Sequence, residues 1–225
     1  MFKSIKTGVL AIILIGTAII AKAQKTFEAG TIIYGVEYLL TDEQKKTIDT
    51  SILPSESKVE FNGSLAKVQV DMGLGILKII NDASVNNALI LVDIPMLQKQ
   101  YAAKMSKEDL DKQMGYLIFS DFKATGEKQN VAGYNTEKYT YKDNKGADYE
   151  LWATTEIKLP KGATPRGFTE LKATAIKFMN IQDGVKTLTT LKNIQKGNVG
   201  PFSIEVPKGY ELKTIAELNA LRGGN

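Results

Sequence analysis

The sequence predicts a mainly β (α+β) protein, an antiparallel half-open β-barrel with short helices over its concave face. Three observations support this fold class. Apolar and polar residues alternate along most of the chain, as they do in strands buried on one face. Turn residues that typically join antiparallel strands separate these runs. Between residues 95 and 114 the apolar spacing changes to every fourth residue, which indicates a helical insertion into the sheet.

The most informative stretch runs from Val131 to Ile157 and carries Trp152, the one tryptophan of the sequence. Its alternation predicts a β-hairpin with a five-residue turn from Asp143 to Ala147. A shift of one residue would set a tyrosine against a glutamate, so one register is preferred. That register pairs Tyr141 with Tyr149, Tyr139 with Leu151, Lys142 with Asp148 and Lys138 with Trp152.

Two antiparallel units are expected before this hairpin. Residues 30–40 alternate as a long strand, and residues 41–57 are polar and predict a loop or short helix. Asn62-Gly63, the dipeptide typical of a type I′ turn, predicts a second hairpin. The strand places Ile32, Tyr34, Val36, Tyr38 and Leu40 on one face, and the hairpin places Val59 and Phe61 on the same face as Ala66, Val68 and Val70.

The middle of the chain predicts two central strands and then helices. Ile76 to Ile80 and Ala88 to Val92 are nearly continuous apolar runs, as expected of strands covered on both faces. From Pro95 to Met114 one or two short helices are expected, because an apolar residue recurs every fourth position and a capping-box pattern follows. The apolar residues are Leu97, Tyr101 and Met105, and the capping pattern is Ser106 with Asp109, before Leu110 and Met114.

The remaining elements are mostly strands. Tyr116 to Lys123 predicts a strand that ends in a turn at Gly126. Residues 169–194 fit either a helix or strands, and Asp183-Gly184 favours a strand hairpin. A last strand is expected from Phe202 to Val206, and a short helix from Thr214 to Leu221.

The first 23 residues predict a signal peptide. Lys3 and Lys6 precede an apolar run from Val9 to Ala21, and Ala21-Lys22-Ala23 is an A-x-A cleavage site. Cleavage would leave one domain, residues 24–225, and lower the net charge from +4 to +1, because it removes three lysines. The sequence has no cysteine, so it offers no lipid attachment point, disulfide or zinc-thiolate site. A periplasmic or secreted protein that does not span the membrane after cleavage is therefore expected.

The residue types limit the chemistry. The sequence contains no histidine, which excludes Ser-His-Asp and Cys-His catalysis and imidazole metal sites. Only Arg166 and Arg222 are arginines, so nucleic acid is not an expected partner. Trp152 with Tyr134 would form a sugar-stacking platform, or Trp152 caps packed surface. Glu150 next to Trp152, or Asp42 with Glu43, would supply half of a glycosidase carboxylate pair, so a glycan hydrolase stays open, with Glu150 and Asp148 as the residues to test.

Several short motifs resemble a family of exported bacterial proteins known as a domain of unknown function. They are Phe27 to Ile32, Val131 to Tyr134 with Lys138-Tyr139, Glu150 to Trp152, and Phe202 to Tyr210. That family is similar in turn to the lipoprotein-carrier (Lol) and mycobacterial lipoprotein superfamily. The resemblance implies a half-barrel with helices over its concave face, and an apolar concavity that shelters acyl chains or another hydrophobic ligand.

The leading functional expectation is a non-enzymatic binding protein for a lipid, an acyl chain or another hydrophobic molecule, with no cofactor, no catalytic residue and no metal. The alternative is an envelope scaffold for protein-protein interaction, with a filled interior and an envelope protein as its partner. The Leu97, Tyr101 and Met105 stripe is either packed core or the lining of an apolar cavity. The expected ligand-binding residues are Tyr101, Met105, Leu110 and Met114.

Overall fold

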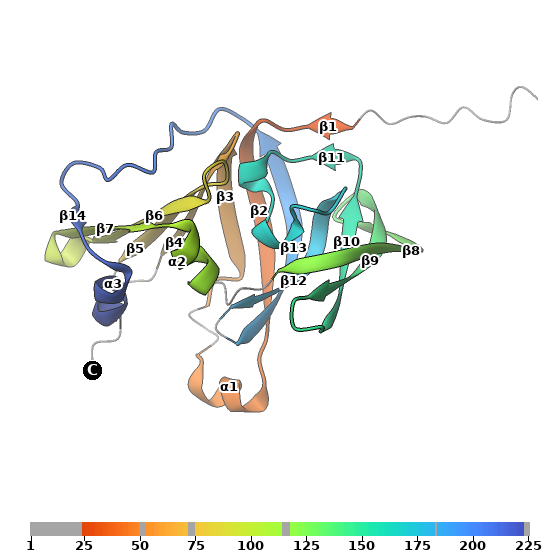
Figure 1. Cartoon of the computed structure of the whole chain (residues 1–225), viewed down its shortest axis with the longest axis horizontal. Coiled ribbons are helices and arrows are strands. Elements are labelled where there is room, and N and C mark those ends of the chain that lie inside the picture. Colours follow the sequence, from red (N-terminus) through yellow and green to blue (C-terminus); the bar gives the residue numbers. More distant parts are fainter. Residues whose placement is uncertain (1–23, 50–52, 72–74, 114–117, 183, 223–225) are drawn as a thin grey trace, which may run out of the picture.

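The computed structural model describes residues 24–49, 53–71, 75–113, 118–182 and 184–222 (Figure 1). The expected signal peptide and Met114 lie outside these residues. The strands are β1 Lys25–Thr26, β2 Ala29–Leu39, β3 Glu56–Asn62, β4 Leu65–Asp71, β5 Ile76–Asp82, β6 Asn87–Ile94, β7 Lys99–Met105, β8 Phe119–Val131, β9 Tyr134–Asp143, β10 Asp148–Thr154, β11 Ile157–Lys158, β12 Thr174–Gln182, β13 Val185–Lys196 and β14 Glu211–Leu212. The helices are α1 Asp42–Thr47, α2 Lys107–Gln113 and α3 Ile215–Arg222, with 3-10 turns η3 Pro95–Leu97, η4 Lys161–Ala163 and η5 Arg166–Phe168.

Twelve strands form one sheet in the order β14-β7-β6-β5-β4-β3-β2-β13-β12-β10-β9-β8. Neighbours in this sheet are antiparallel except β14 and β7, while β1 and β11 form a separate parallel pair. The two edges, β14 and β8, do not pair, so the sheet stays open. The structure therefore confirms a mainly β fold with short helices, and its sheet is a large open one rather than a closed barrel.

Cross-strand pairing defines two faces of this sheet. Val59, Val68, Ile79, Ile90 and Ala103 lie opposite one another from β3 to β7, and so share one face. We call this the inner face. A parallel row on it contains Phe61, Ala66, Asn81, Ala88 and Met105, and another contains Val70, Leu77, Val92 and Tyr101.

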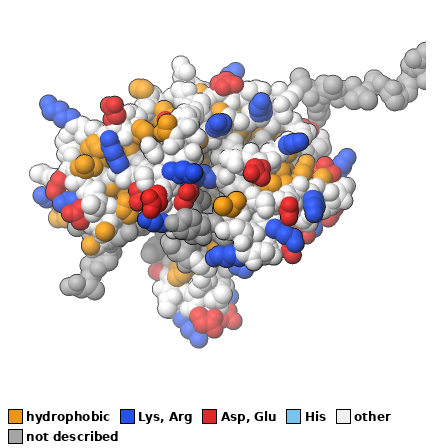
Figure 2. Space-filling model, in the orientation of Figure 1, with side chains coloured by type: hydrophobic (Ala, Val, Ile, Leu, Met, Phe, Trp, Pro, Cys, Tyr) orange, Lys and Arg blue, Asp and Glu red, His pale blue; other side chains and the backbone are white. Residues whose placement is uncertain are grey.

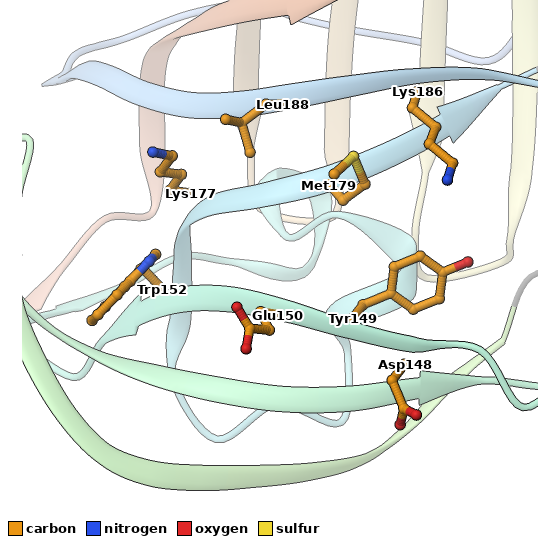
Figure 3. Close-up of a pocket in the computed structure, with 8 residues that line it drawn as sticks. All are labelled: Asp148, Tyr149, Glu150, Trp152, Lys177, Met179, Lys186 and Leu188. Carbon is orange, nitrogen blue, oxygen red and sulfur yellow. The ribbon is translucent and has the colours of Figure 1, made fainter. Parts of the chain in front are cut away.

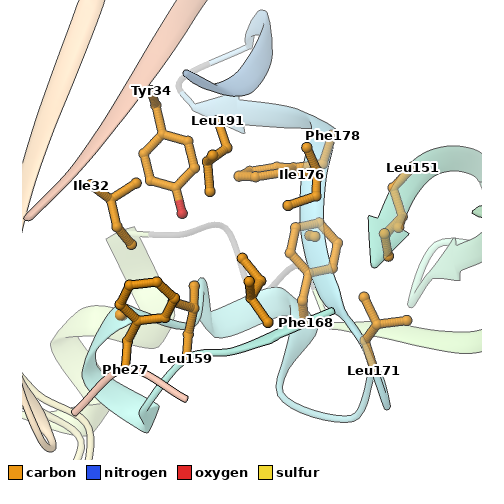
Figure 4. Close-up of a cluster of buried hydrophobic side chains, with 14 of the residues drawn as sticks. Phe27, Ile32, Tyr34, Leu151, Leu159, Phe168, Leu171, Ile176, Phe178 and Leu191 are labelled. Carbon is orange, nitrogen blue, oxygen red and sulfur yellow. The ribbon is translucent and has the colours of Figure 1, made fainter. Parts of the chain in front are cut away.

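One half of the inner face is filled by the chain itself. The segment from β11 through η4 and η5 packs against β2, β3, β8, β9, β10, β12 and β13, and the sheet curves around it in Figure 1. Phe168 lies at the centre of the resulting core, and Figure 4 shows it beside Phe178 and Leu171. The side chains of this core that are less than 2% exposed include Phe27, Ile32, Phe61, Tyr141, Leu151, Ile176 and Leu191.

The other half of the inner face carries the helices. Met105 and Leu110 are buried with Ala88, and Ile215 of α3 packs on the same group. The expected capping box is confirmed, because the Ser106 backbone N–H donates to the Asp109 carboxylate at 2.9 Å and the Asp109 N–H donates to Ser106 Oγ at 3.2 Å. The helices α2 and α3 thus cover the inner face of β6 and β7 at the end that carries Ala88 and Met105.

A strap formed by residues 202–210 covers the outer face of the β4 to β7 half. Phe202, Ile204 and Val206 pack on Leu89 and its buried neighbours without joining the strand ladder. The strand expected from Phe202 to Val206 is therefore wrong, because the period-two spacing of its apolar residues serves packing on a sheet face. The expectation that β5 and β6 are covered on both faces holds for β6 at Ala88 on the inner face and Leu89 on the outer face. It is wrong for β5, whose inner-face residues Leu77 and Ile79 stay partly exposed.

Asp93 anchors the end of this strap. Its carboxylate accepts hydrogen bonds from Tyr210 Oη at 2.6 Å, Gln100 Nε2 at 3.1 Å and Lys78 Nζ at 2.7 Å. Partial burial acts to raise the pKa of Asp93, but these three hydrogen bonds outweigh it and lower the pKa below its ordinary value. Burial and the Asp93 carboxylate raise the pKa of Tyr210 to about 12.

The predicted hairpins are confirmed, with one turn corrected. The β9–β10 register matches the prediction at all four pairs, including Tyr139 with Leu151 and Lys138 with Trp152. In the β3–β4 hairpin the faces are as predicted, but Asn62 pairs with Leu65 and the central turn residues are Gly63 and Ser64. A type I′ turn centred on Asn62-Gly63 would need a positive φ at both residues. Gly63 has φ +58°, but Asn62 stays in the strand and donates to the Val199 carbonyl, so the type I′ assignment is wrong.

Two further expectations are wrong. Residues 99–105 form strand β7 rather than a helix, because Tyr101, Ala103 and Met105 also alternate and the whole segment pairs with β6. Gly126 is not a turn but lies within β8, where its φ of +82° accompanies a shift of register. The turn that ends β8 falls at Ala132-Gly133, both with positive φ. The β12–β13 hairpin and a helix near the expected C-terminal position, α3, are confirmed.

The close approach of η4 to the β3–β4 turn predicts a strong effect of Gly162→Ala. A Cβ at this position would lie 2.7 Å from the Leu65 carbonyl oxygen and from the Ser64 carbonyl carbon, both backbone atoms. We expect the free energy of unfolding, measured with urea, to fall by about 1–3 kcal/mol. Gly197→Ala is the control, since nothing lies within 4 Å of its added Cβ. An equal loss in both variants would contradict this packing.

The anchor of the strap predicts that Tyr210→Phe lowers the free energy of unfolding by about 1–3 kcal/mol, because a hydrogen bond to a charged carboxylate is lost. It also predicts a pH dependence. Since the pKa of Asp93 is lowered by folding, its stabilisation is present above the ordinary aspartate value, about 4, and is lost as the pH falls through the folded value.

The free energy of unfolding of the Asp93→Asn variant, measured in urea titrations, should therefore fall less than that of the wild-type protein as the pH is lowered below about 4. Parallel pH profiles of the two proteins would contradict this role of Asp93.

Candidate ligand-binding surfaces

The inner face of β4 to β7 carries apolar side chains that the packed segments leave partly exposed. They face away from the strap and lie between the filled half of the face and the helices. We call this group the open inner surface. It comprises Val68, Val70, Leu77, Ile79, Val92 and Tyr101, all of intermediate exposure. Exposed aliphatic side chains on several adjacent strands form a continuous apolar area, which is typical of a site for an apolar ligand.

Three of the four expected ligand-binding residues lie on or beside this face. Tyr101 belongs to the open inner surface, and Lys213 Nζ lies 5.7 Å from its ring centroid. Met105 and Leu110 are only 3% and 8% exposed and pack together at its border. Met114 lies outside the described residues. Leu97, the first residue of the predicted stripe, is 65% exposed at η3 and does not join them.

The sequence analysis missed the β4 and β5 members of the surface as ligand residues. The sequence does indicate the face of the β4 residues, since the predicted Asn62-Gly63 hairpin places Val68 and Val70 on the face of Phe61. What leaves them partly exposed is the arrangement of covering segments, which come from residues 107–113, 157–173 and 215–222. That arrangement depends on contacts between residues far apart in the sequence.

The filled half contains two buried hydroxyls without hydrogen-bond partners in the described part of the chain. They belong to Tyr34 and Tyr141, which are 5% and 1% exposed. Burial raises the pKa of both, so both stay protonated at neutral pH. Figure 4 shows the Tyr34 hydroxyl directed between Ile32 and the rings of the core. Each lone hydroxyl costs stability, because it gave up hydrogen bonds to water on folding.

A pocket of about 370 Å³ lies within the loop from Ile157 to Ala175. Its walls combine Phe168 and Leu171 with two lysines, Lys158 and Lys172. The loop is closed by a hydrogen bond from Thr174 Oγ1 to the Ile157 carbonyl at 2.9 Å. Nearby, Arg166 binds Asp111 of α2 at 3.3 Å, which joins the loop to the helix on the same face. This pocket is small and mixed in polarity.

A second pocket, of about 400 Å³, opens on the outer face between β10 and β12 (Figure 3). Trp152, Met179 and Leu188 supply its apolar walls. Tyr134 is not among its residues and packs against the inner core, so the sugar-stacking pair suggested by the sequence does not form. The pocket therefore belongs to a different face from the open inner surface.

The carboxylates near Trp152 are held by lysines. Glu150 lies 2.9 Å from Lys138 Nζ, and Asp148 lies 3.7 Å from Lys142 Nζ. Both carboxylates are mostly exposed, at 60% and 78% of their side chains. An exposed carboxylate that is paired with a lysine lacks the apolar surroundings typical of a catalytic acid. The arrangement offers no support for the hydrolase alternative.

The distribution of charged and apolar side chains on this face does not distinguish one ligand class from another. Lysines and acidic side chains are interspersed over the face seen in Figure 2, among scattered hydrophobic groups. In the part of the chain that the structure describes, no group of acidic side chains is arranged to hold a metal ion. Nor does any described helix have the length and apolar character to cross a membrane.

The chain is similar to known proteins in structure but not in sequence. No family model and no curated protein matches the sequence. Among solved structures, the chain is similar to LprF from Mycobacterium bovis, with 13% sequence identity and a TM-score of 0.34. The alignment covers 80% of this chain and 90% of LprF. A likeness at this TM-score supports no argument about ligand or activity.

The lone hydroxyl of Tyr34 predicts that Tyr34→Phe leaves the free energy of unfolding unchanged or raises it by about 1 kcal/mol, because a buried unpaired group is removed. Tyr149→Phe is the matched control, since its hydroxyl donates to the Asp143 carboxylate at 3.0 Å. That variant should lose about 1 kcal/mol in the same urea titration. A large loss in Tyr34→Phe would show that its hydroxyl is paired in solution.

Proposed function

We propose that the protein is a non-enzymatic, exported binding protein that shelters an acyl chain, a lipid or a similar apolar molecule on its open inner surface. The observation that carries the proposal is the set of aliphatic side chains, Val68, Val70, Leu77, Ile79 and Val92, left partly exposed on one face of adjacent strands. Aliphatic groups without hydrogen-bonding atoms select ligands by burial of apolar area.

The surroundings suit an elongated ligand. The filled core bounds the surface on one side, and α2 and α3 bound it on the other, so an acyl chain would be flanked on two sides. Burial of each methylene contributes about 0.8 kcal/mol, so about ten methylenes contribute about 8 kcal/mol, which works against the cost of immobilising the ligand. Tyr101, at the border of this surface, and Lys213 next to it would meet a polar head group.

A second candidate function, an interaction scaffold for an envelope protein, is favoured by a different observation. Half of the inner face is packed solid, and the β6–β7 connection exposes Met96 and Leu97 at 82% and 65%. Large apolar side chains at such exposure are typical of contacts with another protein. Under this function the open inner surface would be covered by the partner rather than by a lipid.

The first test is mass spectrometry of residues 24–225 purified under native conditions and extracted with organic solvent. We expect a stoichiometric lipid or fatty acid. Thermal unfolding with added palmitate or phosphatidylglycerol should show a raised midpoint, because a ligand at about 100 times its Kd contributes about 2.7 kcal/mol. An empty extract together with an unchanged midpoint would contradict the proposal and leave the scaffold function.

A point variant locates the site. Leu77→Asn places an amide on the open inner surface, and it should lower palmitate affinity at least about tenfold while the fold persists. Gln69→Asn is the control, because Gln69 is exposed on the opposite face of the neighbouring strand β4. Equal affinities of the two variants would place the ligand elsewhere.

A further inference from the structure

The outer-face pocket between β10 and β12 lies where the sheet splits. The ladder between these strands ends at Leu151 and Phe178, although β10 begins at Asp148 and β12 continues to Gln182. A register shift between Trp152 and Ala153 adjoins the split, and such bulges increase local twist. Figure 3 shows the two strands apart, with side chains of both directed toward the space between them.

We propose that this split binds an extended, acidic segment of a partner protein, which adds as a short strand along the uncovered edge of β10. The proposal concerns the opposite face from the lipid site and does not depend on it. In the part of the chain that the structure describes, no strand continues the ladder along the β12 side of Asp148–Glu150. Addition of an extended segment to such an edge is an established mode of recognition, in which backbone hydrogen bonds give affinity.

The charges around the pocket favour an anionic occupant. On the β10 side both acidic groups, Glu150 and Asp148, are already paired with lysines of β9. On the other side Lys177 and Lys186 line the pocket, and neither has a carboxylate partner among the residues described. The pocket therefore offers two ammonium groups to a ligand, while its own carboxylates are neutralised.

The apolar part of the pocket suits alternate side chains of a strand. Trp152 is half-buried, and Met179 and Leu188 lie directly opposite each other on β12 and β13. Tryptophan provides a large, rigid contact area and is enriched at the energetic centres of protein interfaces. Lys177 pairs with Trp152 and lies two residues from Met179 on β12, so the lysines and this floor share the outer face. An added strand that alternates acidic and apolar residues would direct its acidic side chains to that face and its apolar side chains to the inner one.

The pocket has a built-in reporter, because Trp152 is the one tryptophan of the sequence. The probe is a blocked hexapeptide that alternates valine and aspartate, titrated into residues 24–225 while tryptophan fluorescence is recorded. We expect a saturable change that weakens as salt is added, since the attraction is ionic. The same peptide with lysine in place of aspartate should give no saturable change, and an equal response to both peptides would overturn the proposal.

Two controls separate the site from the mode of binding. The double variant Lys177→Glu with Lys186→Glu should weaken binding at least about tenfold. Lys104→Glu should not, because Lys104 is exposed on β7 at the far side of the sheet. Methylation of alternate peptide nitrogens removes the donors needed for strand addition and should abolish binding. Undiminished binding of the methylated peptide, or saturation by an oligogalacturonate with no response to the acidic peptide, would overturn strand addition.

Discussion

The packing of Phe168 against the inner face is the interaction on which the layout of the molecule depends. Its ring centroid lies 5.5 Å from that of Phe119, 5.6 Å from Tyr141 and 5.0 Å from Phe178. These contacts join η5 to β8, β9 and β12, three strands of one half of the sheet. Aromatic pairs at such distances contribute beyond their buried area, and the edge-to-face geometry of two of them fixes the orientation of the ring. Gly167 makes this possible, because a Cβ there would collide with the Phe119 ring.

As a consequence, the two halves of the sheet are covered on different faces. In the half held by Phe168 the chain occupies its own concavity, which explains why Tyr34 and Tyr141 keep unpaired hydroxyls inside a packed core. In the β4 to β7 half the strap 202–210 takes the outer face, so the inner face is left to the helices and the open inner surface. An apolar ligand is thus accommodated beside the filled core rather than within it.

The sequence predicted what nearby residues determine and failed where distant contacts decide. The β9–β10 register followed from alternating tyrosines and lysines within 27 residues, and the structure matches it pair by pair. The four-residue spacing of Tyr101 and Met105 predicts a helix over residues 99–105, but a strand also satisfies this spacing. Pairing with β6 along the whole segment decided between the two readings, and no local pattern contains that pairing.

The same reasoning explains why the candidate surfaces were only partly predictable. Tyr101 and Met105 lie on the inner face, because the face of a strand residue is fixed once the pairing is given, and Leu110 of α2 packs beside Met105. Exposure of Leu77 and Ile79 depends on which segments cover them, and the strap that the sequence marks as a strand covers the opposite face. Alternation identifies an apolar face, but only the packed chain shows whether that face is covered.

The edge of β10 at the outer-face split differs from the free edge strand β8 in its regularity. The free edge strand β8 carries charged residues such as Lys123 and Lys128 and two register shifts, with φ values of +57° at Asp121 and +82° at Gly126. These features disrupt a regular edge and disfavour pairing with another chain. The β10 edge at Asp148–Glu150 has none of the register shifts, because its ladder with β9 runs without interruption. A regular edge beside an apolar floor, in a molecule that disrupts its long free edge, favours specific strand addition at the split over indiscriminate association.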